Sequence, residues 1–228
     1  MAIAYINSAK ALNNTVATTG SLDTTGATLL VVVLAYYSGD PPTLTDNKGN
    51  TWTPLTEYTT GFDVANRIYY CANPTVGAGH TFTGTSVSFG LIFLAVSSFS
   101  GVSTTSPFDV QNGNQTTSIV SSISTGSVTP SEDNELVIIG VGSSATLGPY
   151  TANGGFTVVQ YNVNSYPTNY GGGLGYLIQT TAAAANPTWT FGGNSAYTVA
   201  SIATFKEPGG GGGIFTPLNA IRAGHQGW

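Results

Sequence analysis

The order of strand-like segments occurs twice in this chain, and that duplication limits the fold more than any other feature of the sequence. Four segments of the first half have counterparts in the second: "LLVVVLAYYSG" aligns with "ELVIIGVGSSA", "DNKGNTWT" with "TANGGFTV", "HTFTGT" with "PTWTFG", and "LAVSSFSG" with "ASIATFKE". All four pairs are separated by nearly the same distance, about 105 to 107 residues. This pattern indicates an internal duplication whose unit, roughly a hundred residues, has the length of one small β-sandwich or of half a larger one.

The repeated segments predict strands joined by turns. They are short, rich in β-branched and aromatic residues, and separated by Gly, Pro, Asn and Asp. "DNKGNTW" and "ANGGFTV" predict tight hairpin turns, in which Gly49 and either Gly154 or Gly155 take positive φ. "TTAAAANP" has a helical composition, but Pro187 and the flanking strands favour a loop or a single turn. We therefore predict an all-β protein.

Two architectures accommodate the repeats. Each repeat could form its own immunoglobulin-like sandwich, like two beads, or the two could interleave in one jelly-roll sandwich. The segment between them contains alternating stretches, at 108–111 and 119–127, that are themselves expected to be strands. This favours one continuous β-sandwich body over residues 1–207, built from pseudo-repeats of about 1–101 and 102–207.

Composition and charge exclude several classes of partner. The chain has 228 residues, 41% of them hydrophobic, so it can bury a substantial core. Five Lys and Arg residues against ten Asp and Glu give a net charge of −5, which offers no attraction for nucleic acid or anionic lipid. The longest apolar run, Ala27 to Tyr37, is too short to span a membrane as a helix. We expect no nucleic-acid partner and no membrane insertion.

The polar residues favour an exterior surface. They are mainly Ser, Thr, Gly and Asn, as is typical of proteins outside cells, yet the first residues do not have the pattern of a secretion signal. A virion component released by lysis accounts for both observations, as does a mature secreted chain that begins with a new Met. The first explanation is preferred here.

A resemblance supports this interpretation. The succession "LLVVVLAYYS", "LTDNKGNTWTPL", "IYYCANPTVGAGHTFT" and "LAVSSFSGVSTTSPFD" resembles a recurring β-sandwich repeat of phage virion proteins and of secreted bacterial modular proteins. The likeness covers about residues 15 to 207. Its motifs are structural, so it implies a sandwich of jelly-roll or immunoglobulin-like type on an exterior surface and transfers no catalytic residue.

Few side chains could support catalysis or hold a metal ion. Asp46 and Glu57 are spaced as a carboxylate pair across one hairpin, but the second repeat has no acid at either equivalent position. Oxygen ligands for calcium could come from Asp40, Asp46, Asn47 and Asn50, although the capping of turns explains these residues better. We predict no catalytic residue, no metal site, no cofactor and no enzymatic activity.

Aromatic residues in predicted loops are the candidates for a glycan or protein contact, with loop packing as the alternative. They are Trp52, Tyr58, Tyr161, Tyr166 and Tyr170.

The end of the chain combines a tether with apolar anchors. Residues 208–213 contain five consecutive glycines, which form a flexible linker. The last segment, 214–228, is too short to order itself in isolation and is expected to dock on a neighbouring subunit, with folding back onto its own sandwich as the alternative. The residues expected to dock are Ile214, Phe215, Leu218, Ile221, Arg222 and Trp228.

Together these observations favour a non-enzymatic structural protein of a virion, either a capsid decoration or a tail or fibre component. Its expected partners are other virion proteins or copies of itself. The alternative is a carbohydrate-binding or adhesion module of a secreted bacterial protein, located outside the cell and bound to a surface glycan.

Overall fold

The computed structural model describes residues 1–37, 39, 41–86, 91–144, 148–162, 170–192 and 196–209, with the backbone alone at position 162. The described chain contains sixteen strands and no helix, which confirms the predicted all-β class. These strands form four antiparallel sheets that pack face to face, as expected for a β-sandwich protein.

The first repeat forms one large and one small sheet. The five-stranded sheet has the order β1 (Ala4–Asn13), β8 (Ile92–Ser100), β3 (Leu29–Tyr37), β6 (Val64–Ala72) and β5 (Thr53–Thr59). The three-stranded sheet has the order β2 (Val16–Thr18), β7 (Phe82–Thr85) and β4 (Thr43–Asp46).

The second repeat reproduces this order strand for strand. Its large sheet runs β9 (Phe108–Gln115), β16 (Thr198–Phe205), β11 (Glu135–Ser143), β14 (Gly171–Gln179) and β13 (Thr157–Asn162). Its small sheet runs β10 (Ser122–Ser124), β15 (Thr188–Phe191) and β12 (Tyr150–Ala152). Each strand of the first repeat therefore has its counterpart eight strands later.

Each repeat has the topology of a jelly roll. The first strand pairs with the last, β2 pairs with β7, and β3 pairs with β6, which is the pattern of a long hairpin rolled into two sheets. The fifth strand departs from that pattern, because it extends the large sheet beside β6 instead of joining the small sheet. Every sheet takes all its strands from one half of the chain, so the expectation that the halves interleave is wrong.

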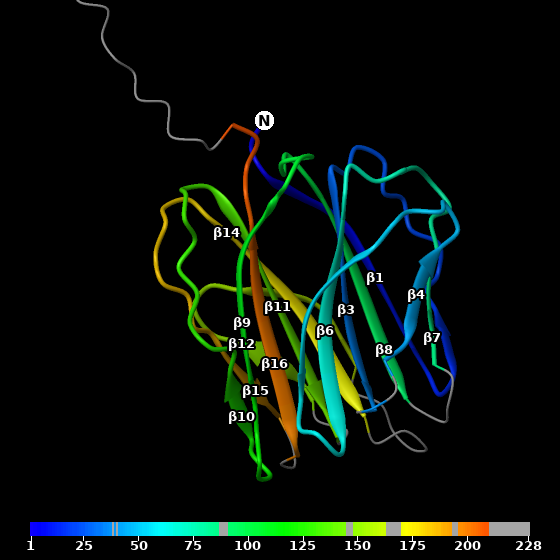
Figure 1. Ribbon diagram of the computed structural model, residues 1–228, viewed down its shortest axis with the longest axis vertical. Coiled ribbons are helices and arrows are strands. Elements are labelled where there is room, and N and C mark those ends of the chain that lie inside the picture. The colour runs from blue at the N-terminus through cyan, green and yellow to red at the C-terminus, as the bar shows by residue number, and fades with distance from the viewer. Residues whose placement is uncertain are drawn as a thin grey trace, which may run out of the picture.

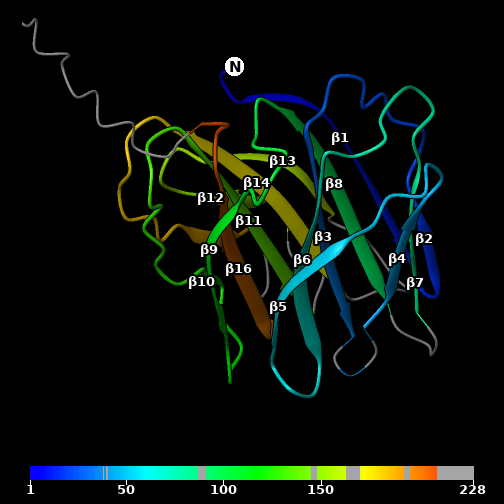
Figure 2. The ribbon, with the colours of Figure 1, turned by 45° about the horizontal axis from the view of Figure 1, so that its top comes forward.

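The two jelly rolls nevertheless form one body, because they share a core. One apolar cluster fills the first repeat and another fills the second, while a third lies between the two large sheets and combines residues of both halves. Figures 1 and 2 show the resulting order of layers: small sheet, large sheet, large sheet, small sheet. The picture of two separate beads is therefore wrong as well.

The double burial of the large sheets explains the longest apolar runs in the sequence. In β3 every residue except Tyr37 is buried, and in β11 every residue is buried. Both strands lie in the middle of a large sheet that has another sheet on each face. Apart from Glu135 at the start of β11, their sequences are therefore continuously apolar or small, without the alternation of a strand that has one face in water.

A pseudo-two-fold axis relates the repeats. Across the shared core β1 contacts β13, β8 contacts β14, β3 contacts β11, β6 contacts β16 and β5 contacts β9. Exchanging each strand for its counterpart in the other repeat reproduces the same set of contacts. The interface therefore has the self-complementary form of a symmetric dimer, although it lies within one chain.

Two groups of aromatic rings show this symmetry at the level of side chains. Tyr176 of the second repeat stacks on Tyr5, with ring centroids 5.2 Å apart, and meets Phe99 edge to face at 5.3 Å. Tyr70 of the first repeat likewise stacks on Phe108 at 6.3 Å and meets Phe205 edge to face at 5.3 Å. Each repeat thus inserts one tyrosine of its sixth strand between two rings of the other.

The centre of the interface breaks the symmetry. Asn66 is fully buried there; its amide donates to the Leu34 carbonyl at 3.2 Å and its oxygen accepts from the Ser201 hydroxyl. The counterpart of Asn66 is Gly172, where an added methyl group would overlap the Phe93 ring. One side of the axis is therefore held by a buried hydrogen bond and the other by a ring packed on bare backbone.

Candidate functional site

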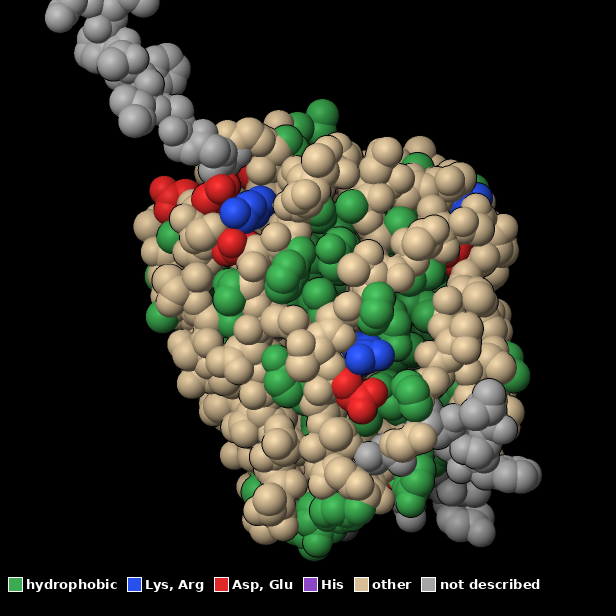
Figure 3. All heavy atoms as spheres, in the orientation of Figure 1, with side chains coloured by type: hydrophobic (Ala, Val, Ile, Leu, Met, Phe, Trp, Pro, Cys, Tyr) green, Lys and Arg blue, Asp and Glu red, His purple; other side chains and the backbone are tan. Residues whose placement is uncertain are grey.

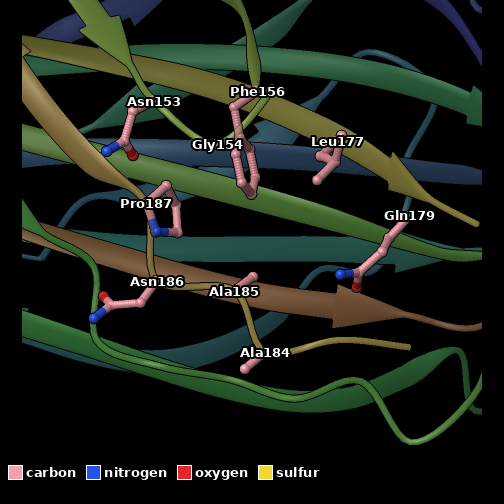
Figure 4. Close-up of a pocket in the computed structure, with 9 residues that line it drawn as sticks. All are labelled: Asn153, Gly154, Phe156, Leu177, Gln179, Ala184, Ala185, Asn186 and Pro187. Carbon is pink, nitrogen blue, oxygen red and sulfur yellow. The ribbon is translucent and has the colours of Figure 1, made fainter. Parts of the chain in front are cut away.

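The described chain has a pocket in the second repeat, between the β12–β13 hairpin and the loop that leads into β15 (Figure 4). Its volume is about 280 Å³, close to the lower end for small-molecule sites. We call it the amide pocket, because three of its side chains are amides. Its lining residues are Asn153, Gly154, Phe156, Leu177, Gln179, Ala184, Ala185, Asn186 and Pro187.

Local sequence explains both walls of the amide pocket. The hairpin turns through Gly154 and Gly155, whose φ angles are +73° and +81°, values that favour glycine. This confirms the predicted turn in "ANGGFTV". The opposite wall is the segment "TTAAAANP", which forms a loop without a helix, as predicted, because it connects two strands and ends at Pro187.

The polar lining of the pocket is uncharged, and only some of its groups form hydrogen bonds with the described residues. The Asn153 oxygen accepts from the Thr188 amide at 2.8 Å, while the Gln179 amide nitrogen donates to the Ala183 carbonyl at 2.9 Å. The Gln179 oxygen is buried and has no partner within the described chain. Asn186 is exposed and makes no side-chain hydrogen bond to the residues that the structure describes.

The rest of the lining is apolar. Figure 4 shows Phe156 and Leu177 directed toward the loop, with Pro187 and Ala185 opposite them. Phe156 and Leu177 are half-buried at the edge of the core of the second repeat, so their positions are set by packing. The pocket therefore offers one apolar surface next to neutral hydrogen-bonding groups.

In the first repeat the equivalent hairpin is bonded down onto the equivalent loop. The Asn50 amide donates to the Thr75 carbonyl at 3.1 Å and its oxygen accepts from the Thr75 amide at 2.6 Å. The Lys48 ammonium donates to the Ala78 carbonyl at 3.3 Å. Four residues separate β12 from β13, whereas six separate β4 from β5, and the longer hairpin supplies the side chains that reach the loop.

Beneath this hairpin lies a buried pair, Asp46 and His80. The His80 Nε2 atom is 3.1 Å from the Asp46 carboxylate, and neither side chain is exposed. The Trp52 indole donates to the same carboxylate at 2.9 Å, and the Thr24 hydroxyl lies 3.0 Å from His80 Nδ1. The carboxylate occupies the position held by Ala152 in the second repeat.

The electrostatics of this pair follow from burial and hydrogen bonding. Burial by itself raises the pKa of Asp46, but hydrogen bonds from the Lys48 amide, Trp52 and His80 outweigh it, so that the pKa lies below its usual value. Burial lowers the pKa of His80, and the hydrogen bond with Asp46 offsets this only in part. At neutral pH an ionised Asp46 accepts from the Nε2–H group of a neutral His80, whose Nδ1 accepts from Thr24.

Thr24, His80 and Asp46 form a chain of hydroxyl, imidazole and carboxylate, the arrangement used in nucleophilic catalysis. Here all three are buried, and the Thr24 oxygen also accepts from the Gly77 amide at 3.1 Å. This geometry favours a structural role. The other predicted carboxylate, Glu57, lies on β5 in the large sheet and accepts from the Tyr36 hydroxyl, so it shares no partner with Asp46.

The Asp46 carboxylate is also the centre of the predicted calcium ligands. It already accepts hydrogen bonds from the backbone amides of Lys48 and Asn50 and from the Asn50 side chain. This pattern is the turn capping that sequence analysis preferred. Asp40 lies outside the described residues. No group of three or more His, Cys, Asp or Glu side chains placed to hold a metal ion is found among the described residues.

The aromatic residues predicted to bind a glycan or a protein lie at separate places. No ring contact joins any two of the four described ones, and Tyr166 lies outside the described residues. Each packs on its own neighbour: Trp52 on Phe82, Tyr58 on Gly113, Tyr161 on Tyr150, and Tyr170 on Tyr37.

Sequence reasoning missed the residues of the amide pocket. A signal for them was present in the comparison of the repeats: the hairpin "DNKGNTW" contains Asp46 and Lys48, whereas "ANGGF" is shorter and uncharged. A shorter, neutral hairpin at the equivalent position indicates that the second repeat lacks the long polar side chains that fill the space beside the loop in the first repeat.

The predicted docking residues of the C-terminal segment all lie outside the described residues, so their role stays a prediction. No helix among the described residues has the length and apolar character needed to cross a membrane. Comparison of the chain with protein-family models, with curated proteins and with solved structures finds no match.

Proposed function

We propose that this protein is a non-enzymatic structural component of a virion, a capsid decoration or a tail or fibre protein, and that its C-terminal segment docks on a neighbouring subunit. The observation that carries the proposal is the pair of jelly rolls joined through a pseudo-two-fold core into one block. Jelly rolls build viral capsids and lectins, so the fold alone supplies an analogy; the sheet edges, the charge of the surface and the end of the last strand support the proposal further.

The sheet edges of this block suit a protein present in many copies. Unpaired edge strands promote aggregation, and here the four edges of the large sheets meet in pairs at two seams. At one seam the Gln160 amide donates to the Ser8 hydroxyl at 2.9 Å. At the other, the Thr56 amide donates to the Gln111 oxygen at 3.0 Å and the Gln111 amide donates to the Thr56 hydroxyl at 2.9 Å.

The surface has few charges that would repel a second copy. Figure 3 shows the face of the molecule that is turned to the viewer in Figure 1. Charged side chains on that face are few, and uncharged atoms cover most of it. With 7% charged residues in the whole chain, copies can approach without a large electrostatic penalty.

The root of the C-terminal segment is fastened to the body. The Lys206 ammonium lies 3.3 Å from Asp109 and 3.4 Å from Glu132, and its backbone amide donates to the Pro107 carbonyl at 2.8 Å. The run of five glycines begins at residue 209, three positions after Lys206. Force applied to the C-terminal segment would therefore be transmitted to the end of β16, which these contacts hold to the body. This suits a segment that docks on another subunit.

The experiment compares the full chain with a chain that ends at Glu207. Both are mixed with virions purified from the protein's source, and bound and free protein are separated by sedimentation. We expect the full chain to sediment with the particles and the shortened chain to stay in solution. If the shortened chain binds with unchanged affinity, the docking proposal is wrong; if neither chain binds, the virion assignment is wrong.

A second candidate function is that of a carbohydrate-binding or adhesion module. The amide pocket favours it, since the pocket offers neutral hydrogen-bonding groups beside an apolar wall. A protein on the outside of a virion could also use such a site to contact a cell-surface glycan, so the two functions are compatible.

A further inference from the structure

We propose that the amide pocket of the second repeat binds one neutral sugar residue of a glycan, with Asn153, Gln179 and Asn186 contacting its hydroxyl groups and Phe156 and Leu177 contacting its ring. This proposal does not depend on the virion assignment. The residues differ from the tyrosines and the tryptophan that sequence analysis selected.

The amides match hydroxyl groups. A sugar hydroxyl both donates and accepts hydrogen bonds, and a side-chain amide offers a donor and an acceptor at fixed positions. The Asn153 side-chain nitrogen has no acceptor among the described residues, while the side-chain oxygen accepts from the Thr188 backbone amide. The Gln179 oxygen lacks a donor within the described chain, and a hydroxyl in the pocket would supply one after a small rotation of the terminal amide.

The apolar wall matches the other property of a sugar, its face of C–H groups. Phe156 presents a half-buried ring, Leu177 extends the same surface, and Pro187 lies opposite them on the other wall. Small-molecule sites usually combine such an apolar lining with a few placed polar groups. A volume of about 280 Å³ accommodates one ring with its substituents, while a longer glycan would extend into solvent.

The absence of charge in the lining restricts the ligand class. None of the nine lining residues is ionisable. A carboxylate or phosphate on the ligand would lose hydration beside Phe156 and Leu177 without gaining a cationic partner. Neutral hexoses and N-acetylhexosamines are therefore favoured over acidic sugars.

An apolar anchor from a protein is a poorer fit for the same pocket. A ring or an aliphatic side chain would cover the amides of Gln179 and Asn153 without bonding to them, which leaves buried polar groups unsatisfied. A sugar is therefore the proposed ligand, and the chain's own C-terminal segment is tested as a competing occupant.

The first repeat provides a matched internal control. The equivalent space is filled by Lys48 and Asn50, which bond to the 75–81 loop. Binding should therefore be limited to one site per chain, in the second repeat. Asn47 is the first-repeat counterpart of Asn153, since its oxygen accepts from the Thr81 amide at 3.0 Å just as Asn153 accepts from Thr188.

The experiment titrates the full-length, ¹⁵N-labelled protein with methyl glycosides of neutral hexoses and with N-acetylhexosamine, one at a time, and follows the side-chain amide signals by NMR. We expect at least one sugar to shift the signals of Asn153, Gln179 and Asn186 with a Kd on the order of 1 mM, typical of a ligand with about a dozen non-hydrogen atoms. A panel in which no neutral sugar shifts these signals overturns the proposal.

Variants of the full chain locate the site. Asn186→Ala and Gln179→Met should each weaken binding by about 3-fold to 10-fold, the loss that corresponds to one hydrogen bond. Ala184→Phe should abolish binding, because Ala184 is an exposed wall residue and the added ring occupies the pocket. Asn47→Ala should leave the affinity unchanged. Unchanged binding by Ala184→Phe, with a native spectrum elsewhere, contradicts the proposal.

Two further titrations separate the competing ligands. A glucuronide and a sugar phosphate should bind more weakly than the neutral sugars, and tighter binding of either contradicts the proposal. A synthetic peptide of residues 214–228 should not compete with the sugar. If the peptide displaces it from the pocket, the site is a docking site for the C-terminal segment, and the sugar proposal is wrong while the proposed virion function gains support.

Discussion

The two repeats have the same strand order but differ at one equivalent hairpin, which is closed over its loop in the first repeat and open in the second. In the first repeat the hairpin after β4 is charged and closes over a buried aspartate and histidine and a half-buried tryptophan. In the second repeat the hairpin after β12 is short and neutral, and it leaves the amide pocket open. The comparison shows that a jelly roll of this kind does not need the polar network to fold, since its twin has alanine at the same position.

The difference also separates two uses of polar groups. In the first repeat every oxygen of Asp46 has partners, so the network is a closed structural unit. In the second repeat the Gln179 oxygen has no partner among the described residues. A closed network stabilises the fold, whereas an incomplete one leaves groups available for a ligand.

The largest effect is expected for Asp46→Ala. Removing the carboxylate leaves the buried His80 and the half-buried Trp52 with donors that have lost their acceptor, so we expect a loss of about 3 to 5 kcal/mol, or roughly 10 °C in Tm. Asn153→Ala in the second repeat should cost only about 1 kcal/mol, one hydrogen bond. Chemical denaturation measures both, and equal losses would show that the two hairpins contribute alike.

A second test concerns the pseudo-two-fold core. Tyr70→Ala and Tyr176→Ala each remove the ring that one repeat inserts into the other, so each should cost about 2 to 3 kcal/mol. Because their surroundings are equivalent, the two losses should agree within about 1 kcal/mol. Ile119→Ala, at a side chain that is 59% exposed, is the control and should cost little. Very different losses for the two tyrosines would contradict the pseudo-symmetry of the core.

The second repeat should lose stability as pH rises from 4.5 to 7. Glu135 is fully buried on β11, and burial raises its pKa to about 7 from an ordinary value of 4.5. A carboxyl whose folded pKa is raised contributes stability that is complete below 4.5 and lost as pH rises through 7. Glu135→Gln should remove this loss, which we expect to be about 3 kcal/mol, since one pKa unit corresponds to about 1.4 kcal/mol. Parallel pH profiles for the two proteins would refute the assignment.

The first repeat should respond to pH in the opposite direction. The lowered pKa of His80 means that the unfolded chain binds a proton at a higher pH than the folded chain. Stability is therefore complete above 6.5 and falls as pH drops below that value toward the folded pKa. The Glu135→Gln variant lacks the pH response of Glu135. In that background His80→Gln should flatten the remaining dependence of stability on pH below 6.5. A slope that persists in the double variant must come from another group.

The smallest effect is expected for truncation after Glu207. The last strand, β16, ends at Phe205, and the described cores contain no residue beyond it. The melting temperature of the shortened chain should therefore match that of the full chain. A decrease of more than about 10 °C, or roughly 3 kcal/mol, would mean that the C-terminal segment belongs to the core.

Much of the fold could be predicted from the sequence, because the evidence for it is local or repeated. Alternating and continuous apolar runs indicate strands, Gly49, Gly154 and Gly155 mark turns, and the constant distance between similar segments indicates a duplication. These features depend on the conformational preferences of single residues and on the periodicity of short segments, which neighbouring residues determine.

The pairing of sheets and the amide pocket were decided only by tertiary structure. The sequence of β3 is apolar on both faces, so it does not say which face meets the other repeat; packing assigns Val31 and Val33 to the shared core and Val32 and Leu34 to the core of the first repeat. The pocket depends on whether a hairpin side chain reaches a loop about 25 residues away in the chain, as Asn50 does with Thr75. Such contacts depend on how close two distant segments lie after folding. A single sequence does not show how close they come in space.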